Sequence, residues 1–291
     1  MNKKVLNRFF ASLLFCGLLL GTKQVEANPY QDKVNADITE FRAFFKAQFP
    51  DVKFEEFANG VYAIDADVYK RQDARQQWQE MEEFPPYALA VDEGKALFEK
   101  PFANKKTYAD YFGNGGAVRQ NYPYFDEKRN TVVTLEMAIN DCRVANGEQP
   151  LSYKSQELAK ISAYMAFISR GQPVNVKVES EGAYNAYLKG KEYFYSQRGK
   201  LNMSCSICHM QYAGRRLRSE TPSPALGHPT HYPVFRSKWG EIGVLHRRYA
   251  QCSDNIGIKA QPYQSEAYRN FEFFTTTMAN GLTFNGPASR K

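Results

Sequence analysis

The chain has 291 residues, of which 43% are hydrophobic, and 38 Lys and Arg against 31 Asp and Glu give it a formal net charge of +7. This length is enough for one large or two small domains. Removing residues 1–27 takes away four bases and one acid and leaves about 264 residues with a charge of about +4. Nucleic acid is therefore a poor candidate for a partner, although this charge still favours the approach of anions.

The first 27 residues have the pattern of a secretory signal peptide. Three basic residues precede an apolar run at 9–21, and Val-Glu-Ala at 25–27 suits signal peptidase. About 13 apolar residues are too few for a membrane anchor, which needs ~20. Cys16 follows Phe15, where a lipoprotein signal needs a small residue, so we expect it to be removed with the signal. We predict periplasmic export, a mature protein beginning at Asn28, and no membrane span after signal removal.

The mature chain contains an internal repeat. "YPYF" at 122–125 recurs as "YPVF" at 232–235, and this offset of 110 gives ten identities in fifty ungapped positions, with Cys142 aligned to Cys252. "GKALFEK" from Gly94 likewise resembles "GKEYFYS" from Gly190. A repeat of this size indicates two copies of one domain. We place them at 28–171 and 172–291, joined by an extended connection with alternating valines after Gly171.

Both copies are predicted to be mainly α-helical. In the second copy, 182–199 and 265–281 carry aromatic residues at helical spacing, and the later segment ends in Asn-Gly as a helix C-terminus would. We interpret the aromatic stripes as core packing.

Cys205-Ser206-Ile207-Cys208-His209 matches the C-x-x-C-H pattern of covalent c-type haem attachment. Cys205 and Cys208, one helical turn apart, would bind the two vinyl groups, and His209 would bind the iron. A thioredoxin-type pair or half a zinc site fits less well, because no second C-x-x-C exists and export matches the compartment of haem attachment. The first copy carries "ANKKTYADYFGNGG" at 103–116 in this place, without Cys or His. We expect one covalently attached haem c, in the second copy.

Spacing alone leaves the sixth iron ligand open. The candidates are His228, His231, His246, Met278 and Cys252. Met278 would make the site resemble small electron-transfer cytochromes, in which Met and His ligation raises the potential.

Cys252 lies in "GVLHRRYAQCSDN", which predicts a helix over 244–251. Arg248 would then lie one turn before Cys252 with Arg247 alongside, and nearby cations favour the thiolate. Alternatively, the two arginines are a solvated basic pair and Cys252 forms a disulfide with Cys142, as an oxidising compartment permits. Cys142 would otherwise be a relic or a packed thiol. The aligned positions of the two cysteines argue somewhat against the disulfide, since equivalent positions suit equivalent sites.

Three segments together resemble the SoxA family, the catalytic cytochrome subunits of the SoxAX complex of bacterial thiosulfate oxidation. They are "GKEYFYSQRGKLNMSCSICH", "LHRRYAQC" and "QSEAYRNFEFFTTTMANGL", and the likeness covers most of the mature chain. The resemblance implies two cytochrome c-like domains. It makes Cys205 and Cys208 the thioether cysteines, His209 the proximal ligand, and Cys252 the distal ligand and active-site cysteine, often found as a persulfide in this family. Arg248 and Arg247 would hold thiosulfate.

The resemblance also implies the reaction, which joins thiosulfate to a cysteine of SoxY in the SoxYZ carrier while electrons leave through haem to SoxX. This chain departs from the two-haem members because its first C-x-x-C-H is missing, which leaves the role of Cys142 in doubt. Three other functions stay open. They are a simple electron carrier with His209 and Met278 as ligands, a thiosulfate dehydrogenase that forms tetrathionate, and a non-catalytic haem-binding partner.

Overall fold

The structure is a computed structural model that describes residues 28–65, 72–217 and 220–291, so the predicted signal peptide and Cys16 lie outside the described residues. Helices dominate the described chain, which confirms the predicted mainly α-helical class. None of the described helices combines the length and apolar content that crossing a membrane requires.

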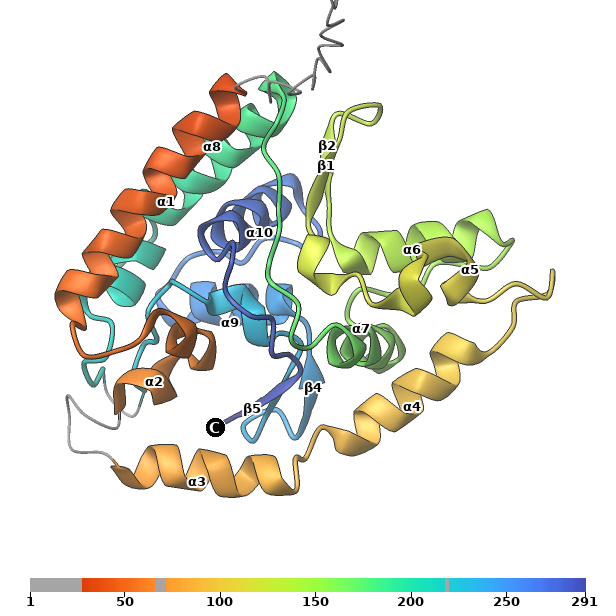
Figure 1. Ribbon diagram of the computed structural model, residues 1–291, viewed down its shortest axis with the longest axis horizontal. Coiled ribbons are helices and arrows are strands. Elements are labelled where there is room, and N and C mark those ends of the chain that lie inside the picture. Colours follow the sequence, from red (N-terminus) through yellow and green to blue (C-terminus); the bar gives the residue numbers. More distant parts are fainter. Residues whose placement is uncertain (1–27, 66–71, 218–219) are drawn as a thin grey trace, which may run out of the picture.

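The described chain begins with a long amphipathic helix, α1. The Asn28 side chain caps it by accepting the backbone N–H groups of Tyr30 and Gln31. One face of α1 is apolar and packs on α8 and α10, where the structure buries Val34, Ile38, Phe41 and Phe45 (Figure 1). The elements of this segment are α1 (Pro29–Gln48), η1 (Phe54–Asn59), α2 (Val61–Asp65) and α3 (Gln72–Glu83).

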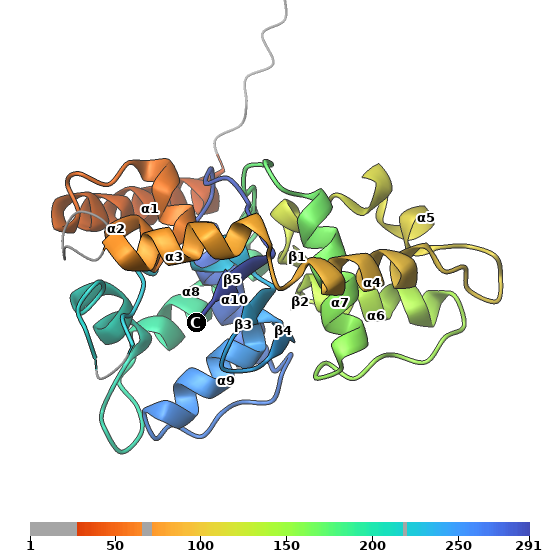
Figure 2. The same ribbon diagram turned by 90° about the horizontal axis from the view of Figure 1, so that it is seen from below.

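Two lobes follow, seen side by side in Figure 2. We call residues 88–171 the first half and 172–291 the second half. The first half contains α4 (Ala88–Glu99), α5 (Tyr108–Phe112), η2 (Asn114–Gly116), η3 (Arg119–Asn121), β1 (Tyr124–Asp126), β2 (Thr131–Val133), α6 (Leu135–Ala145) and α7 (Gln156–Ile168). The second half contains α8 (Glu181–Tyr195), η4 (Ile207–Gln211), η5 (His228–His231), β3 (Val234–Arg236), β4 (Glu241–Gly243), α9 (Leu245–Asn255), α10 (Glu266–Met278) and β5 (Ala288–Arg290).

The order of elements recurs between the halves. β1, β2, α6 and α7 each begin and end 110 residues before β3, β4, α9 and α10, which is the offset of the sequence motifs. Both strand pairs are antiparallel hairpins, and in the second half β5 adds a parallel strand beside β3. A duplication as the origin of this recurrence stays a prediction.

A close helix crossing occurs in each half at the glycine that the sequence comparison aligned. A Cβ on Gly94 of α4 would lie 2.0 Å from the carbonyl oxygen of Lys160 in α7. A Cβ on Gly190 of α8 would lie 2.0 Å from the carbonyl oxygen of Asn270 in α10. Only glycine permits this approach of two backbones.

The hydrophobic cores divide the chain differently from the predicted domains. One cluster contains first-half side chains only, including Phe98, Tyr108 and Met165. A larger cluster joins α1 to the second half, and a third, with Tyr87 and Ile242, lies between the halves. Residues 28–65 therefore pack with the second half, while the boundary after Gly171 stays a prediction about sequence units.

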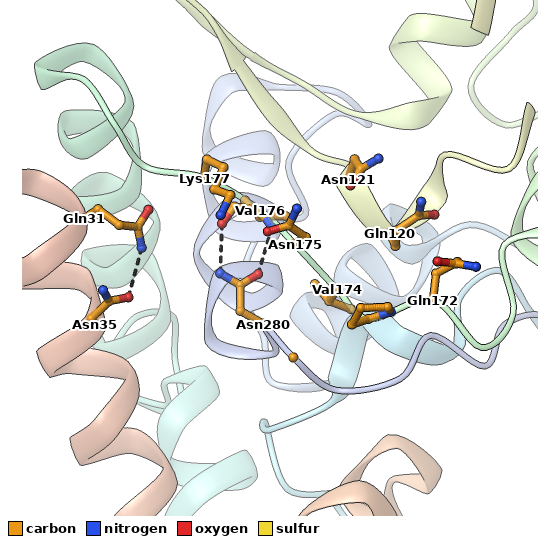
Figure 3. A pocket seen from close by; sticks show the side chains of 12 residues that line it. Gln31, Asn35, Gln120, Asn121, Gln172, Val174, Asn175, Val176, Lys177 and Asn280 are labelled. Carbon is orange, nitrogen blue, oxygen red and sulfur yellow. Dashed lines mark hydrogen bonds between the residues drawn. The ribbon is translucent and has the colours of Figure 1, made fainter. Parts of the chain in front are cut away.

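The connection after Gly171 is extended, with Val174, Val176 and Val178 alternately buried. Asn280 holds it in place, because its side chain both donates to and accepts from the backbone of Val176 (Figure 3). Carboxamide side chains around this contact line a hollow of about 510 Å³. Hydrogen bonds at Val176 and Val178 thus make this segment an ordered part of the fold.

Candidate functional site

The C-x-x-C-H segment follows α8 and forms a short helical turn that is π-helical from Ile207 to Gln211. The Ser204 hydroxyl accepts the backbone N–H of Ile207 at 3.2 Å, which starts the turn that continues through η4. Cys205 and Cys208 lie one turn apart and are both unpaired. Burial raises the pKa of both thiols, to about 12 for Cys205, and the charge of Cys252 adds to the rise.

His209 is oriented as a metal-binding imidazole would be. Its Nδ1 lies 2.8 Å from the backbone oxygen of Ser223, so Nδ1 carries the proton and the lone pair of Nε2 is free. Burial lowers the pKa of His209 to about 4, which keeps the ring neutral. Two free thiols and a neutral imidazole with a free Nε2 are the donors that a c-type haem needs. The residues present therefore fit this group.

The other three histidines have surroundings that differ from those of His209. The His228 ring packs against the edge of the His209 ring at a centroid distance of 4.3 Å, so it lies beside His209 rather than opposite it. Its Nε2 is 2.7 Å from the Ser223 hydroxyl. His231 is buried, and the positive charge of Arg290 adds to burial in lowering its pKa. His246 faces Glu272 at 3.1 Å.

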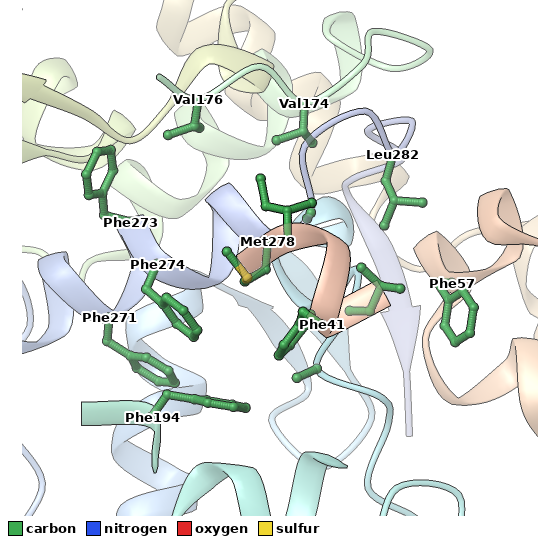
Figure 4. Packing of buried hydrophobic residues seen from close by; sticks show 14 of the residues in the cluster. Phe41, Phe57, Val174, Val176, Phe194, Phe271, Phe273, Phe274, Met278 and Leu282 are labelled. Carbon is green, nitrogen blue, oxygen red and sulfur yellow. The ribbon is translucent and has the colours of Figure 1, made fainter. Parts of the chain in front are cut away.

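Met278, the electron-carrier alternative, is 1% exposed and packs in the larger hydrophobic cluster. Figure 4 shows it at the end of α10 among the aromatic rings of Phe41 and Phe274. Within the described ranges, no three His, Cys, Asp or Glu side chains gather closely enough to hold a lone metal ion. The zinc interpretation of the sequence gains no support.

Cys252 and Arg248 lie on one face of α9, as the sequence predicts. The helix spans both residues, which are one turn apart, and both side chains are partly buried. Burial lowers the pKa of the Arg248 guanidinium, but the nearby acidic side chains, Cys252 foremost, hold it above its ordinary value. Cys252 also raises the pKa of Cys205 and of Cys208, so it lies within electrostatic range of both cysteines.

The structure does not bring Arg247 to this place. Its guanidinium lies 2.6 Å from Glu241 and stacks 4.5 Å from the centroid of the Trp239 ring. Adjacent residues of a helix point about 100° apart, so Arg247 and Arg248 serve different faces.

The disulfide alternative is wrong, because Cys142 and Cys252 are both free. Cys142 is a packed thiol with 0% exposure in the core of the first half, beside Phe98 and Leu158. Burial raises its pKa to about 11. Apolar and aromatic side chains therefore surround this cysteine in the half that lacks the haem motif.

Sequence reasoning missed Arg236 at the end of β3, which lies near Arg248. Arg236 is 6% exposed, its guanidinium is 3.6 Å from Glu220, and no hydrogen-bond partner for its Nε occurs among the described residues. Burial lowers the pKa of Arg236, and the charge of Arg248 lowers it further. The recurring "YPVF" motif marked this segment as part of a repeat, but spacing gave no sign that it reaches α9.

Comparisons with known proteins agree on one family. A family model described as the SoxA/TsdA cytochrome c domain matches residues 93–174, in the half without C-x-x-C-H. An L-cysteine S-thiosulfotransferase subunit SoxA of Chlorobaculum tepidum is 63% identical over 284 residues, covering 96% of this chain and 97% of that protein. One of Allochromatium vinosum is 45% identical, covering 97% of each. The crystal structure of SoxXA from P. pantotrophus matches with a TM-score of 0.68 at 24% identity, covering 74% of this chain and 84% of that one.

Proposed function

Because the chain belongs to the SoxA family of L-cysteine S-thiosulfotransferase subunits, we propose that it joins thiosulfate to a cysteine thiol of the SoxY carrier protein. A cytochrome c domain implies a c-type haem, and we propose one per chain, attached through Cys205 and Cys208 with His209 as proximal ligand. Cys252 would be both the distal sulfur ligand and the reacting group.

The observation that carries this proposal is the meeting of Cys252 and Arg248 with the C-x-x-C-H cysteines. A simple electron carrier needs an iron ligand, but it does not need a free thiol and a buried guanidinium on the same helix face. Met278, which would serve such a carrier, is packed in the core. The geometry therefore favours sulfur chemistry beside the haem.

The chain's own residues account for the substrate and the sulfur transfer. Arg248 and Arg236 would hold the thiosulfate dianion through charge-assisted hydrogen bonds. The Cys252 thiolate forms a bond to the terminal sulfur of thiosulfate, and two electrons leave. The carrier thiolate then attacks that same sulfur, and Cys252 departs as thiolate. The haem, when bound, supplies the electron acceptor next to the sulfur.

The partners and the compartment of this reaction are part of the same proposal. SoxX would form the heterodimer and receive the electrons, and SoxYZ would present the carrier cysteine. The matched crystal structure is of a SoxXA complex, which supports the heterodimer, and the matched L-cysteine S-thiosulfotransferase subunits support a cysteine as the acceptor. Periplasmic localisation rests on the signal pattern in residues 1–27.

Replacing Cys252 tests the function directly. We expect Cys252→Ala to keep the covalent haem, because Cys205 and Cys208 are untouched, and to lose conjugation of thiosulfate to the carrier. Carrier mass and haem absorbance measure the two properties. Retained conjugation would remove Cys252 from the mechanism. Tetrathionate formed by the unaltered protein without carrier would favour a thiosulfate dehydrogenase instead.

A further inference from the structure

A buried cluster of charged side chains connects the first half to the helix that carries Cys252. At its centre lies Glu272 of α10, which is 1% exposed. One carboxylate oxygen accepts from Nη2 of Arg119 at 3.3 Å, and the other lies 3.1 Å from Nε2 of His246 in α9. Arg119 is 2% exposed and His246 is 1% exposed, so water does not compete for these contacts.

The first half fixes the position of Arg119. Its backbone N–H donates to the Ser169 hydroxyl at 3.0 Å, at the end of α7. Its Nη1 donates to the backbone oxygen of Tyr122 at 2.9 Å. Both hydrogen bonds come from the first half, and the guanidinium also lies 5.5 Å from the centroid of the Phe284 ring in the second half.

His246 has one tautomer in this environment. Its Nδ1 accepts the backbone N–H of Gln264 at 3.0 Å, so the proton of the neutral ring is on Nε2 and faces Glu272. The Thr134 hydroxyl, which caps α6 in the first half, donates to Oε1 of Gln264 at 2.8 Å. The imidazole thus accepts a hydrogen bond from Gln264 on one side and lies 3.1 Å from Glu272 on the other, in a polar contact without the alignment of a hydrogen bond. Each side leads back to the first half.

The charges of the cluster are balanced. Burial raises the pKa of Glu272, but His246 and Arg119 outweigh it and hold the pKa below its ordinary value. Burial and the charge of Glu272 raise the pKa of Glu136, a neighbouring acid that accepts from the Ser162 hydroxyl at 2.8 Å. The pKa of Glu272 is accordingly held low beside Arg119, whereas the pKa of Glu136 is raised.

We propose that Arg119, Glu272 and His246 are positioning residues that fix the rotation of α9 and thereby the place of the Cys252 sulfur. This rests on the proposed function of Cys252. Tyr249 and Ser253 share the buried face of α9 with His246, whereas Arg248 and Cys252 lie on the next face. The first half, which lacks the haem motif, would thus act in the reaction by holding this helix.

The size of the effect follows from helix geometry. The end of a side chain lies about 5 Å from the helix axis, so turning α9 by about 20° would move the Cys252 sulfur by about 2 Å. Apolar contacts tolerate such a turn, but the 3.1 Å contact between Nε2 of His246 and the Glu272 carboxylate would be lost. Catalytic groups must be held within about 0.5 Å of their productive place.

Three single variants of the haem-loaded chain separate positioning from packing. His246→Phe keeps the ring but loses the polar contact, whereas His246→Gln places an amide N–H where Nε2–H stood. Glu136→Gln is the matched control, since it replaces a carboxyl in the same buried region by an amide of the same shape without touching His246. Each is examined by low-temperature electron paramagnetic resonance of the ferric protein, by carrier conjugation and by thermal unfolding.

We expect H246F to lose the narrow g spread of sulfur ligation and about 10- to 100-fold of its turnover, while H246Q and E136Q keep both. If His246 only filled space, H246F would keep the sulfur signal and the turnover, and H246Q would lose them. An unchanged signal in folded H246F, or equal losses in H246F and H246Q, would overturn the positioning role.

If H246F does not fold, Arg119→Lys decides. A lysine cannot reach both Glu272 and the Tyr122 carbonyl as a guanidinium fork does, so the sulfur signal should weaken. An unchanged signal in R119K would refute the proposal. Absence of a sulfur-ligated signal in the unaltered protein would instead remove the proposed function, and with it the positioning role.

Discussion

Arg247 and Arg248 are neighbours in sequence but have different surroundings. Arg248 lies one turn from Cys252, which raises the pKa of the Arg248 guanidinium. Arg247 binds Glu241 and stacks on Trp239. The second cation of the site comes from β3, where Arg236 is buried beside the same residues. A doubly charged anion such as thiosulfate would therefore contact two guanidinium groups, one from α9 and one from β3.

We predict that Arg248→Gln and Arg236→Gln each raise the KM for thiosulfate. Losing a hydrogen bond from a charged donor costs about 1.5–3 kcal/mol, which corresponds to roughly 10- to 100-fold. Arg247→Gln is the matched control on the same helix, and its KM should stay close to that of the unaltered protein. Steady-state kinetics with the carrier measure all three. A larger rise in KM for R247Q than for R236Q would mean that Arg247, and not Arg236, is the second cation of the site.

At the scale of elements, the α8–α10 crossing holds the helix before the C-x-x-C-H segment against the helix that carries Glu272. Gly190 makes the crossing possible, because a Cβ there would meet the backbone of Asn270. A backbone atom cannot turn aside as a flexible side chain can, so a larger residue would push the helices apart. The equivalent crossing of α4 and α7 at Gly94 has the same geometry.

We expect Gly190→Ala to lower the free energy of unfolding by about 2 kcal/mol or more. Overpacking typically costs about 1–3 kcal/mol, and the 2.0 Å approach here lies at the severe end of that range. The helix propensity gained from alanine, ~1 kcal/mol, is too small to compensate. Urea unfolding measures the change, with Lys189→Ala on the exposed face of α8 as control. Equal stability of G190A and the unaltered protein would show that the two helices separate without cost.

At the scale of the whole molecule, the two halves share an order of elements but differ in what surrounds their equivalent cysteines. The first half buries Cys142 among aromatic and aliphatic side chains where the second half has its cysteine site. The second half does not close its own core, because α1 covers it with four apolar side chains. The half that carries C-x-x-C-H therefore depends on α1, a helix far from it in the sequence.

We predict that Phe41→Ala destabilises the protein by about 3–5 kcal/mol, because its ring is 5% exposed between Phe194 and Phe274. Phe44→Ala, on the outer face of the same helix where the ring is 39% exposed, should cost less than about 1 kcal/mol. Denaturant unfolding followed by haem absorbance would report the second half. Similar values for the two variants would mean that α1 does not complete that core.

Local spacing in the sequence determined a large part of this protein. The C-x-x-C-H run, the i to i+4 relation of Arg248 and Cys252, and the 110-residue recurrence depend on neighbours along one helix or on self-similarity. The structure agrees with the helical spacing and recovers the offset in its elements. Short-range periodicity is enough for such features, because helix geometry is the same in every protein.

Tertiary structure alone decided the rest. It gave Arg247 its partners Glu241 and Trp239, brought Arg236 to the site from another element, and buried Met278 in the core. It also packed Cys142 away from Cys252 and joined Arg119 to Glu272 across 153 residues. Such contacts depend on how helices pack in three dimensions, and a residue's spacing along the chain does not encode which distant side chain fills the space beside it.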